Sequence, residues 1–338
     1  MHAATIHAAG DIRWQEVPDP KITKDTEAIV KVVAGCICGS DLWPYRGENP
    51  ITAGDTIGHE CVGIVEEVGG AVRSFRPGDF VIVPFCHSDN TCAHCRHGFT
   101  SVCENLGFTT SGQGEYTLVH EAEGSLVKVD GTPDAGLIPS LLALSDVMPT
   151  GWHAAVAAGV TPGSTAVVVG DGAVGLCGVL AASRLGAERI IAMSRHEPRQ
   201  EIARAFGATD IVVERGKEGA ARIADMTDGV GADSVLECVG TDQSMKTALK
   251  VARPGGNVGF VGVPHGVELP IRTMFQRNVG LRGGMAPVRA YLPELLELVT
   301  SGAINPGLVF DLTLSMPDVA EGYRAMDERR AVKVLLQP

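Results

Sequence analysis

A glycine-rich segment that follows a strand pattern and precedes a helix pattern is the feature that most constrains the fold. Residues 164–170 read Ser-Thr-Ala-Val-Val-Val-Gly, as in a buried strand, and continue as Gly170-Asp-Gly172-Ala-Val-Gly175 before an amphipathic helix. In this order Gly172 lets a pyrophosphate approach the backbone, Gly175 lets the helix pack on the strand, and the helix N-terminus faces the phosphate charge. The segment predicts a dinucleotide-binding fold whose cofactor contacts include Gly170, Gly172, Ala173, Val174 and Gly175.

The end of the next predicted strand, residues 189–194, indicates which dinucleotide binds. An acidic residue at this point would accept hydrogen bonds from the ribose hydroxyls of NAD, but the chain has Ser194 followed by Arg195. A hydroxyl and a guanidinium can bind a 2′-phosphate, whereas a carboxylate would repel it. We therefore expect NADP, with Arg199 and Thr150 as further contacts, and NAD is the alternative.

A histidine and a carboxylate stand side by side between glycines in the run Gly58-His59-Glu60-x-x-Gly63. Upstream, residues 29–33 are apolar and β-branched, so they predict a strand that presents Cys38 on the turn after it. Thiolate, imidazole and carboxylate are the groups that bind zinc in proteins. Ser40 lies beside Cys38 in sequence, and its hydroxyl can accept a proton and pass it on. These residues predict a metal centre with a proton-transfer group next to it.

The longer pattern Gly58-His59-Glu60-x-x-Gly63-x5-Gly69-x-x-Val72 resembles the signature of the zinc-containing alcohol dehydrogenases of the medium-chain dehydrogenase/reductase superfamily. The turn Cys38-x-Ser40-Asp41 is similar to that family's first zinc ligand and proton-relay residue, and the resemblance covers essentially the whole chain. It implies a catalytic zinc held by Cys38, His59 and Asp146. In the family the third protein ligand stands five residues before a glycine, and Asp146 stands at that position before Gly151. Glu60 is then a ligand in at least some states, and Ser40 is the relay.

A second metal site is predicted on a long loop with the spacing Cys92-x2-Cys95-x7-Cys103. In the family, a structural zinc is bound there by four cysteines, and the first of these positions is Asp89 in this chain. Three interpretations follow: Asp89 is an oxygen ligand, Cys86 reaches in from three residues earlier, or the lobe holds no zinc. Asp89 is the favoured ligand, because carboxylates bind zinc and the register matches.

The expected fold class is α/β, with a Rossmann doubly wound parallel sheet and a mostly β, GroES-like catalytic domain. Residues 1–149 alternate short β-branched runs with Gly, Pro and Asp turns, which predicts antiparallel strands and a zinc lobe at about 86–105. Residues 150–286 alternate strands with helices and form the predicted dinucleotide-binding domain. The resemblance implies that residues 287–338 return to the catalytic domain.

The composition of the chain limits the kinds of partner that the protein is expected to bind. The net charge of −12 argues against nucleic acid, because phosphate binding needs a basic face. No apolar run approaches the roughly 20 residues of a membrane span. The N-terminus has no signal-peptide pattern, and nine cysteines are then more naturally thiols and metal ligands than disulfides. We expect a cytoplasmic protein, and relatives in the family are dimers or tetramers, which implies a homo-oligomer.

The predicted activity is zinc-dependent hydride transfer between NADP(H) and an alcohol, ketone or aldehyde. Apolar residues near the motifs favour a small to medium secondary alcohol as substrate; they are Trp43, Phe85, Leu106 and Trp152. An alternative is an NAD-dependent dehydrogenase of polyols, sugars or amino alcohols such as sorbitol or threonine. An alternative of another class is a catalytically silent redox sensor or structural protein. The presence of all the predicted metal ligands, the relay serine and the glycines argues against it.

Overall fold

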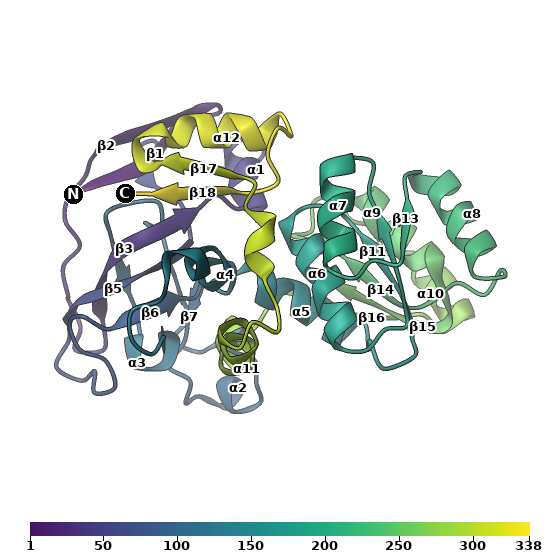
Figure 1. The fold of residues 1–338 in the computed structure, drawn as a ribbon, viewed down its shortest axis with the longest axis horizontal. Helices are drawn as coiled ribbons and strands as arrows, with labels where there is room; N and C mark the ends of the chain where they lie inside the picture. Colours follow the sequence, from purple (N-terminus) through teal and green to yellow (C-terminus); the bar gives the residue numbers. More distant parts are fainter. The chain divides into compact units, whose positions relative to one another are not determined.

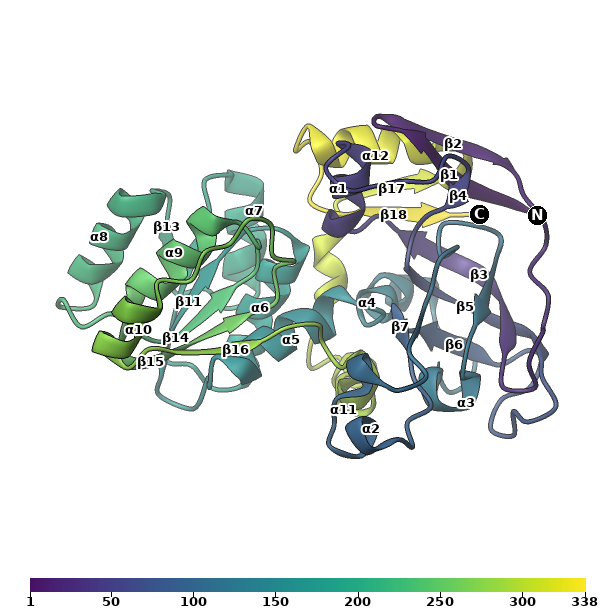
Figure 2. The same cartoon turned by 180° about the vertical axis from the view of Figure 1, so that it is seen from behind.

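The computed structural model describes all 338 residues and divides the chain into two compact units. Unit 1 comprises Met1–Pro149 and Pro287–Pro338, and unit 2 comprises Thr150–Ala286. The C-terminal part of unit 1 contains β17, α12 and β18, which are drawn in yellow in Figure 1 and seen from behind in Figure 2. Unit 1 is therefore built from both ends of the chain.

A seven-stranded sheet forms the centre of unit 1, with the order β10-β6-β5-β3-β18-β17 and with β9 paired to β3. All of its pairs are antiparallel except β17 with β18. This arrangement confirms the mostly β architecture predicted for the first part of the chain. The strands are β3 (Ala28–Cys36), β5 (Glu60–Val68), β6 (Phe80–Val83), β9 (Tyr116–Val119), β10 (Val127–Lys128), β17 (Leu312–Ser315) and β18 (Val334–Gln337).

Smaller elements surround this sheet. A three-stranded sheet has the order β2-β1-β4, and β7 pairs with β8; these strands are β1 (His2–Ala8), β2 (Asp11–Glu16), β4 (Asp55–Thr56), β7 (Cys86–His87) and β8 (Gly107–Phe108). The helices of unit 1 are short apart from α11 and α12; they are α1 (Leu42–Tyr45), α2 (Ala93–Arg96), α3 (Ala122–Ser125), α4 (Ile138–Ala143), α11 (Val288–Thr300) and α12 (Val319–Asp327).

The core of unit 1 fixes the strand that leads to the candidate metal ligands. Val30 and Val32 of β3, Val65 of β5, Tyr323 of α12 and Leu336 of β18 are all buried in one cluster. Each such aliphatic side chain contributes about 1.5–3 kcal/mol when it leaves water. Because β5 pairs with one edge of β3 and β18 pairs with the other, both the N-terminal and the C-terminal segments hold the end of β3 in place.

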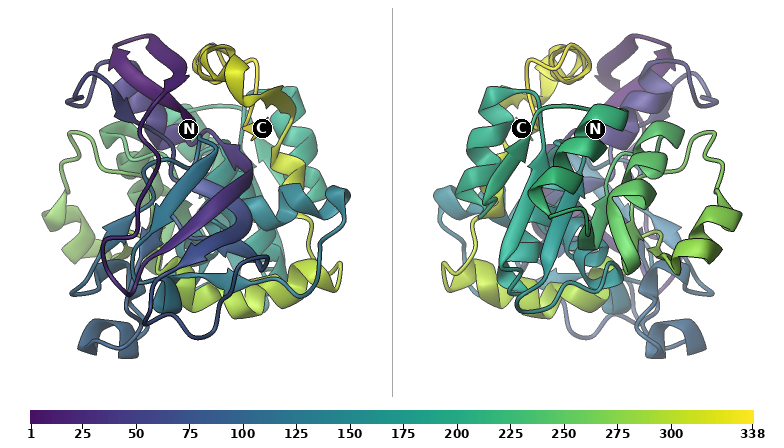
Figure 3. Two further views of the ribbon diagram at one scale, coloured as in Figure 1. Left: turned by 90° about the vertical axis from the view of Figure 1, so that its left-hand side faces the viewer. Right: turned by 90° about the vertical axis from the view of Figure 1, so that its right-hand side faces the viewer.

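Unit 2 is a six-stranded parallel sheet with the order β13-β12-β11-β14-β15-β16. Helices α6 and α7 cover one face of it, and α8, α9 and α10 cover the other (Figures 1 and 3). The chain leaves β11 toward β12 and later returns to β14 on its other side, which confirms the doubly wound order and creates a switch point at β11. The strands are β11 (Thr165–Val169), β12 (Arg189–Met193), β13 (Asp210–Val212), β14 (Ala232–Glu237), β15 (Ala252–Phe260) and β16 (Gly280–Gly283).

The helices of unit 2 are α6 (Ala173–Arg184), α7 (Glu197–Ala205), α8 (Gly216–Met226), α9 (Asp242–Val251) and α10 (Ile271–Arg277), preceded by α5 (Val147–Ala157). Pro149 and the Ala-rich residues after it predict a helix that begins near Thr150. In the structure α5 begins at Val147, so this predicted boundary is wrong. Pro149 lies in the first turn of the helix, where its missing N–H removes no intrahelical hydrogen bond. None of the helices has the length and hydrophobicity that a membrane span requires.

Candidate functional sites

Local backbone geometry places the candidate metal ligands of unit 1. Gly58 has φ +95°, and a Cβ at this position would lie 2.3 Å from Cγ of Gln113, so only glycine fits immediately before His59. Strand β5 then begins at Glu60, which is paired in register with Cys36 of β3. Cys38 follows β3 as the N-cap of the short 3-10 helix Gly39–Asp41. Pairing between two strands therefore brings a cysteine and a histidine from distant parts of the sequence together.

The structure gathers Cys38, His59, Glu60 and Asp146, with one potential ligand atom of each within 4.8 Å of the others. Oδ2 of Asp146 lies 3.3 Å from Nε2 of His59 and 3.5 Å from Sγ of Cys38. A thiol, an imidazole and carboxylates at this spacing form a donor set suited to tetrahedral zinc. The four residues that the sequence and the resemblance assigned to a catalytic metal thus lie around one point.

The electrostatics of this group, which we name the Cys38 cluster, favour a positive charge at its centre. Burial and then the charges of Glu60 and Asp146 raise the pKa of the Cys38 thiol. Burial alone would lower the pKa of His59, but Asp41 and then Cys38 raise it well above its ordinary value. Acids that resist ionisation and a base that retains its proton are both signs of excess negative charge. A divalent cation would neutralise that charge and stabilise the thiolate.

Asp41, which the sequence analysis gave no role, orients His59. Its Oδ1 lies 3.1 Å from Nδ1 of His59, and its Oδ2 accepts hydrogen bonds from the Cys38 backbone at 3.0 Å and from Nε2 of Gln113 at 3.1 Å. Tyr323 donates in turn to Oε1 of Gln113 at 3.0 Å. When Nδ1–H donates to Asp41, Nε2 presents its lone pair toward the cluster. The position of Asp41 directly after Ser40 was the only sequence signal for this contact.

Glu60 is paired with a lysine from the other end of the chain. Nζ of Lys333 lies 2.6 Å from Oε1 of Glu60 and 3.2 Å from the backbone oxygen of Ile37, and both charged side chains are at most 1% exposed. Oε2 of Glu60 is buried and has no hydrogen-bond partner. One carboxylate oxygen is therefore held by Lys333, and the other is left available beside the Cys38 cluster. Sequence patterns could not find Lys333, because the segment that leads into β18 carries no metal-binding motif.

Two other predicted residues border the Cys38 cluster. Ser40 lies in the 3-10 helix after Cys38 and is partly exposed to solvent. The ring of Phe85 meets that of His59 edge to face, with centroids 6.2 Å apart. An apolar ring at this position excludes water from one side of the imidazole. Of the other proposed pocket residues, Trp152 is buried in unit 2 and Leu106 is half-exposed on the lobe.

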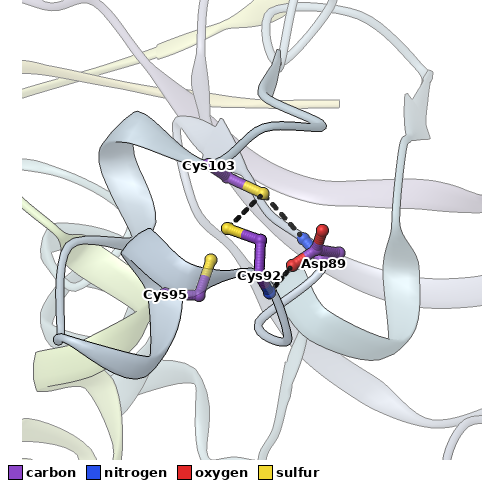
Figure 4. Close-up of side chains that lie close together, drawn as sticks. All are labelled: Asp89, Cys92, Cys95 and Cys103. Carbon is purple, nitrogen blue, oxygen red and sulfur yellow. Dashed lines mark hydrogen bonds between the residues drawn. The ribbon is translucent and has the colours of Figure 1, made fainter.

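The lobe of unit 1 gathers a second donor set, formed by Asp89, Cys92, Cys95 and Cys103 (Figure 4). One ligand atom of each lies within 4.8 Å of the others, and Sγ of Cys92 is 3.9 Å from Sγ of Cys103. Backbone N–H groups of Cys95 and Glu104 lower the pKa of Cys92, which favours its thiolate. Backbone N–H groups of Asp89 and Asn105 donate to the sulfur of Cys103. These donors favour the thiolate of Cys103, but burial outweighs them and raises the pKa of that thiol, so a metal ion is needed to hold it deprotonated.

Asp89 has a role in the loop as well as a place in this set. Its carboxylate accepts hydrogen bonds from the backbone of Thr91 at 2.7 Å, from that of Cys92 at 2.9 Å and from Nδ2 of Asn105 at 2.9 Å. An ionised carboxylate has about four lone-pair sites, so it can accept these bonds and still bind a metal. Cys86, the alternative ligand, lies in β7 outside the group, and burial raises the pKa of its thiol to about 12.

The glycine-rich loop of unit 2 has the geometry of a phosphate cradle. A Cβ on Gly175 would lie 1.9 Å from the backbone oxygen of Gly170, so α6 can approach β11 only with glycine there. A Cβ on Gly172 would meet nothing within 4 Å, which leaves open space beside the helix start. Gly172 is the N-cap of α6 and supplies no side-chain cap, so the first N–H groups of the helix are free for an anion. Ala173 and Val174 begin this helix.

The predicted 2′-phosphate residues lie at the end of β12, but they are not equally available. Ser194 is buried and donates to Oδ2 of Asp171 at 2.8 Å. Nη1 of Arg199 lies 3.2 Å from Oδ1 of Asp171. Arg195 is exposed and has no ion-pair partner. Thr150 is buried in α5. The sequence analysis treated Asp171 only as a spacer between glycines and so missed its contacts.

Comparison with known proteins agrees with this geometry. Residues 24–131 match the model of the alcohol dehydrogenase GroES-like domain, and residues 173–301 match that of zinc-binding dehydrogenases. A probable zinc-binding alcohol dehydrogenase of Mycobacterium tuberculosis is 37% identical over 332 residues, which cover 96% of this chain and 84% of that protein. A sorbitol dehydrogenase of Bacillus subtilis is 31% identical over 311 residues, covering 90% of this chain and 87% of that one.

Among solved structures, the alcohol dehydrogenase of Thermus sp. ATN1 superposes with a TM-score of 0.91 at 31% identity and covers 100% of this chain and 99% of its own. The matched regions include both sheets described above and the loops that carry the two donor sets. The chain therefore belongs to the zinc-dependent alcohol dehydrogenases of the medium-chain dehydrogenase/reductase superfamily, a family of oxidoreductases.

Proposed function

We propose that this protein transfers a hydride between NADP(H) and a small to medium secondary alcohol, or the corresponding ketone or aldehyde. The observation that carries the proposal is the Cys38 cluster, in which a thiol, an imidazole and two carboxylates from three segments of the chain surround one point in a negatively charged setting. Unit 1 then acts as the catalytic domain and unit 2 as the dinucleotide-binding domain.

Cys38, His59 and Asp146 would hold the catalytic zinc, and Glu60 is close enough to join them through the oxygen that Lys333 does not hold. When bound, zinc supplies the Lewis acidity that favours loss of a proton from an alcohol, and the nicotinamide accepts or supplies the hydride. The partly exposed hydroxyl of Ser40 accepts the proton that leaves the alcohol and passes it on. Asp41 keeps His59 in the orientation that points Nε2 into the cluster.

The preference for NADP is supported by the residues at the end of β12. No acid stands at that strand end; instead Ser194 is followed by the exposed and unpaired Arg195. Gly170, Gly172 and Gly175 would receive the pyrophosphate at the N-terminus of α6.

We further propose that Asp89, Cys92, Cys95 and Cys103 hold a structural zinc. The lobe around them is built from short helices and turns, so a metal would replace the hydrophobic core that it lacks. The protein is proposed to work in the cytoplasm as a dimer or tetramer, which cell fractionation and light scattering of the purified protein would test.

Initial rates with 2-propanol, sorbitol and threonine, each with NADP and with NAD, test the proposal. We expect the highest kcat/KM with 2-propanol and NADP, and we expect Cys38→Ser to lose activity. A clear preference for NAD would contradict the cofactor assignment. Full turnover in Cys38→Ser would reject the Cys38 cluster as the catalytic centre and with it the mechanism above.

The second candidate is an NAD-dependent polyol dehydrogenase, which the similarity to the sorbitol dehydrogenase of Bacillus subtilis supports. The same zinc chemistry oxidises any carbinol that reaches the metal, so the pocket decides between the two. Faster turnover of sorbitol with NAD than of 2-propanol with NADP would favour this candidate. Absence of turnover with every substrate, in protein that contains zinc and binds the dinucleotide, would favour a catalytically silent role.

A further inference from the structure

The glycine loop of unit 2 contributes a carboxylate at the place where the end of β12 lacks one. Asp171 lies between Gly170 and Gly172, and its Oδ2 accepts a hydrogen bond from Oγ of Ser194 at 2.8 Å. Its Oδ1 lies 3.2 Å from Nη1 of Arg199, which is also 3.3 Å from the backbone oxygen of Asp171. Both side chains of this ion pair are about one-eighth exposed, at 13% for Arg199 and 12% for Asp171.

This arrangement affects the binding of NAD and of NADP in opposite directions. A carboxylate beside Ser194 can accept hydrogen bonds from the two hydroxyls of an adenosine ribose, as an acid at the strand end would. A 2′-phosphate at the same place would compete with Asp171 for the hydroxyl of Ser194 and the guanidinium of Arg199, and its charge would be repelled. The neighbouring Arg195 forms no ion pair with a carboxylate, so its guanidinium is available to bind the 2′-phosphate.

We propose that Asp171 limits the preference for NADP over NAD, because a 2′-phosphate must displace its carboxylate from Ser194 and Arg199. The inference rests on the proposed function, in which unit 2 binds a nicotinamide dinucleotide. It adds that the preference for NADP is moderated from the glycine loop and is not decided by the end of β12 alone. Substitution of Asp171 therefore strengthens binding of the phosphorylated cofactor.

Calorimetric titration with 2′,5′-ADP and with 5′-AMP tests this without any turnover, because these fragments differ only in the 2′-phosphate. Asp171→Asn removes the charge and keeps the side-chain size. We expect it to bind 2′,5′-ADP about tenfold more tightly than the wild type, since a partly screened like charge at contact distance is removed. Its affinity for 5′-AMP should stay within about threefold, because the amide oxygen still accepts from the ribose.

Asp233→Asn is the matched control, because Asp233 also pairs with an arginine in unit 2, Arg253 at 2.7 Å, and makes no contact with the glycine loop. It should leave the ratio of the two affinities unchanged. Asp171→Ser provides a second uncharged variant should the asparagine protein fail to fold. Arg195→Gln should selectively weaken the binding of 2′,5′-ADP, both as a single substitution and when combined with Asp171→Asn.

The outcomes separate the two levels of the argument. A wild type that binds neither fragment overturns the proposed function, and this inference with it. A wild type that binds both, with the same affinity ratio in both Asp171 variants, overturns the role of Asp171 alone. A rise in the ratio that Asp233→Asn also shows would attribute the effect to net charge and would likewise reject the inference.

Discussion

Replacing Lys333 with methionine is expected to destabilise unit 1 severely, because it leaves Glu60 charged and unpaired in the core. The side chains of Lys333 and Glu60 are 1% and 0% exposed, and their charged atoms are 2.6 Å apart. At that distance an effective dielectric constant of about 20 gives an attraction of about 6 kcal/mol, part of which offsets the cost of desolvating both charges. Removing one partner of a buried ion pair typically costs about 3–5 kcal/mol, and we expect about 4 kcal/mol for Lys333→Met.

Urea unfolding of metal-free protein measures this change, since a bound zinc would give the freed Glu60 another partner. Trp14 and Trp43 lie in unit 1 and Trp152 lies in unit 2, so a Trp152→Phe background makes tryptophan fluorescence report unit 1. The double variant Glu60→Gln with Lys333→Met carries no buried charge and should recover at least about half of the loss.

Two results would refute the reasoning about Lys333. A loss below about 1 kcal/mol in Lys333→Met would mean that Glu60 is not held as a buried carboxylate. Additive losses in the double variant would mean that the two side chains do not interact, because coupled neighbours deviate from additivity.

Three further substitutions test other contacts. Hydrogen bonds from the Thr23 and Lys24 backbone outweigh burial and lower the pKa of Glu27 from 4.5 to about 2. This stabilisation of about 3 kcal/mol is present above about pH 4.5 and is lost as the pH falls toward 2. In metal-free protein, the difference in unfolding free energy between the wild type and Glu27→Gln should therefore shrink over that range. A difference that stays constant would contradict this account of Glu27. Asp41→Asn should weaken zinc binding about 10–100-fold in chelator competition, and an unchanged affinity would show that Asp41 does not orient His59. Gly175→Ala should lower the melting temperature of unit 2, whereas Gly172→Ala, which meets open space, should not; equal effects would oppose the close-packing argument.

The fold class was predictable because its signals are local. The strand before Gly170 and the helix after Gly175 are adjacent in sequence, and the β-branched runs of residues 28–33 and 61–68 need no distant information. The structure places them in β11, α6, β3 and β5. Strand boundaries were less predictable, since β3 extends to Cys36 and β15 begins at Ala252, where pairing with neighbouring strands continues the backbone beyond the apolar run.

The contacts that complete the sites were not predictable from patterns. Lys333 meets Glu60 across 273 positions of sequence, and a lone lysine directly before an apolar strand carries no signal of its partner. Asp41 and Asp171 lie inside recognised motifs, but a motif gives the residues that touch a ligand and not those that orient them. Asp146 was identified only through resemblance, because nothing in its neighbourhood distinguishes a ligand from a helix cap.

Zinc content by plasma mass spectrometry, in the purified wild type and in Cys38→Ser, tests the central claim most directly. We predict about two zinc ions per chain in the wild type and about one in Cys38→Ser, because the set formed by Asp89, Cys92, Cys95 and Cys103 lies apart from Cys38. Cys95→Ser should also retain about one zinc ion per chain. Of the two variants, only Cys95→Ser should be active, because its remaining zinc is the one held by the Cys38 cluster. Equal zinc in the wild type and in Cys38→Ser would contradict the account, because the metal would then not be held by the Cys38 cluster.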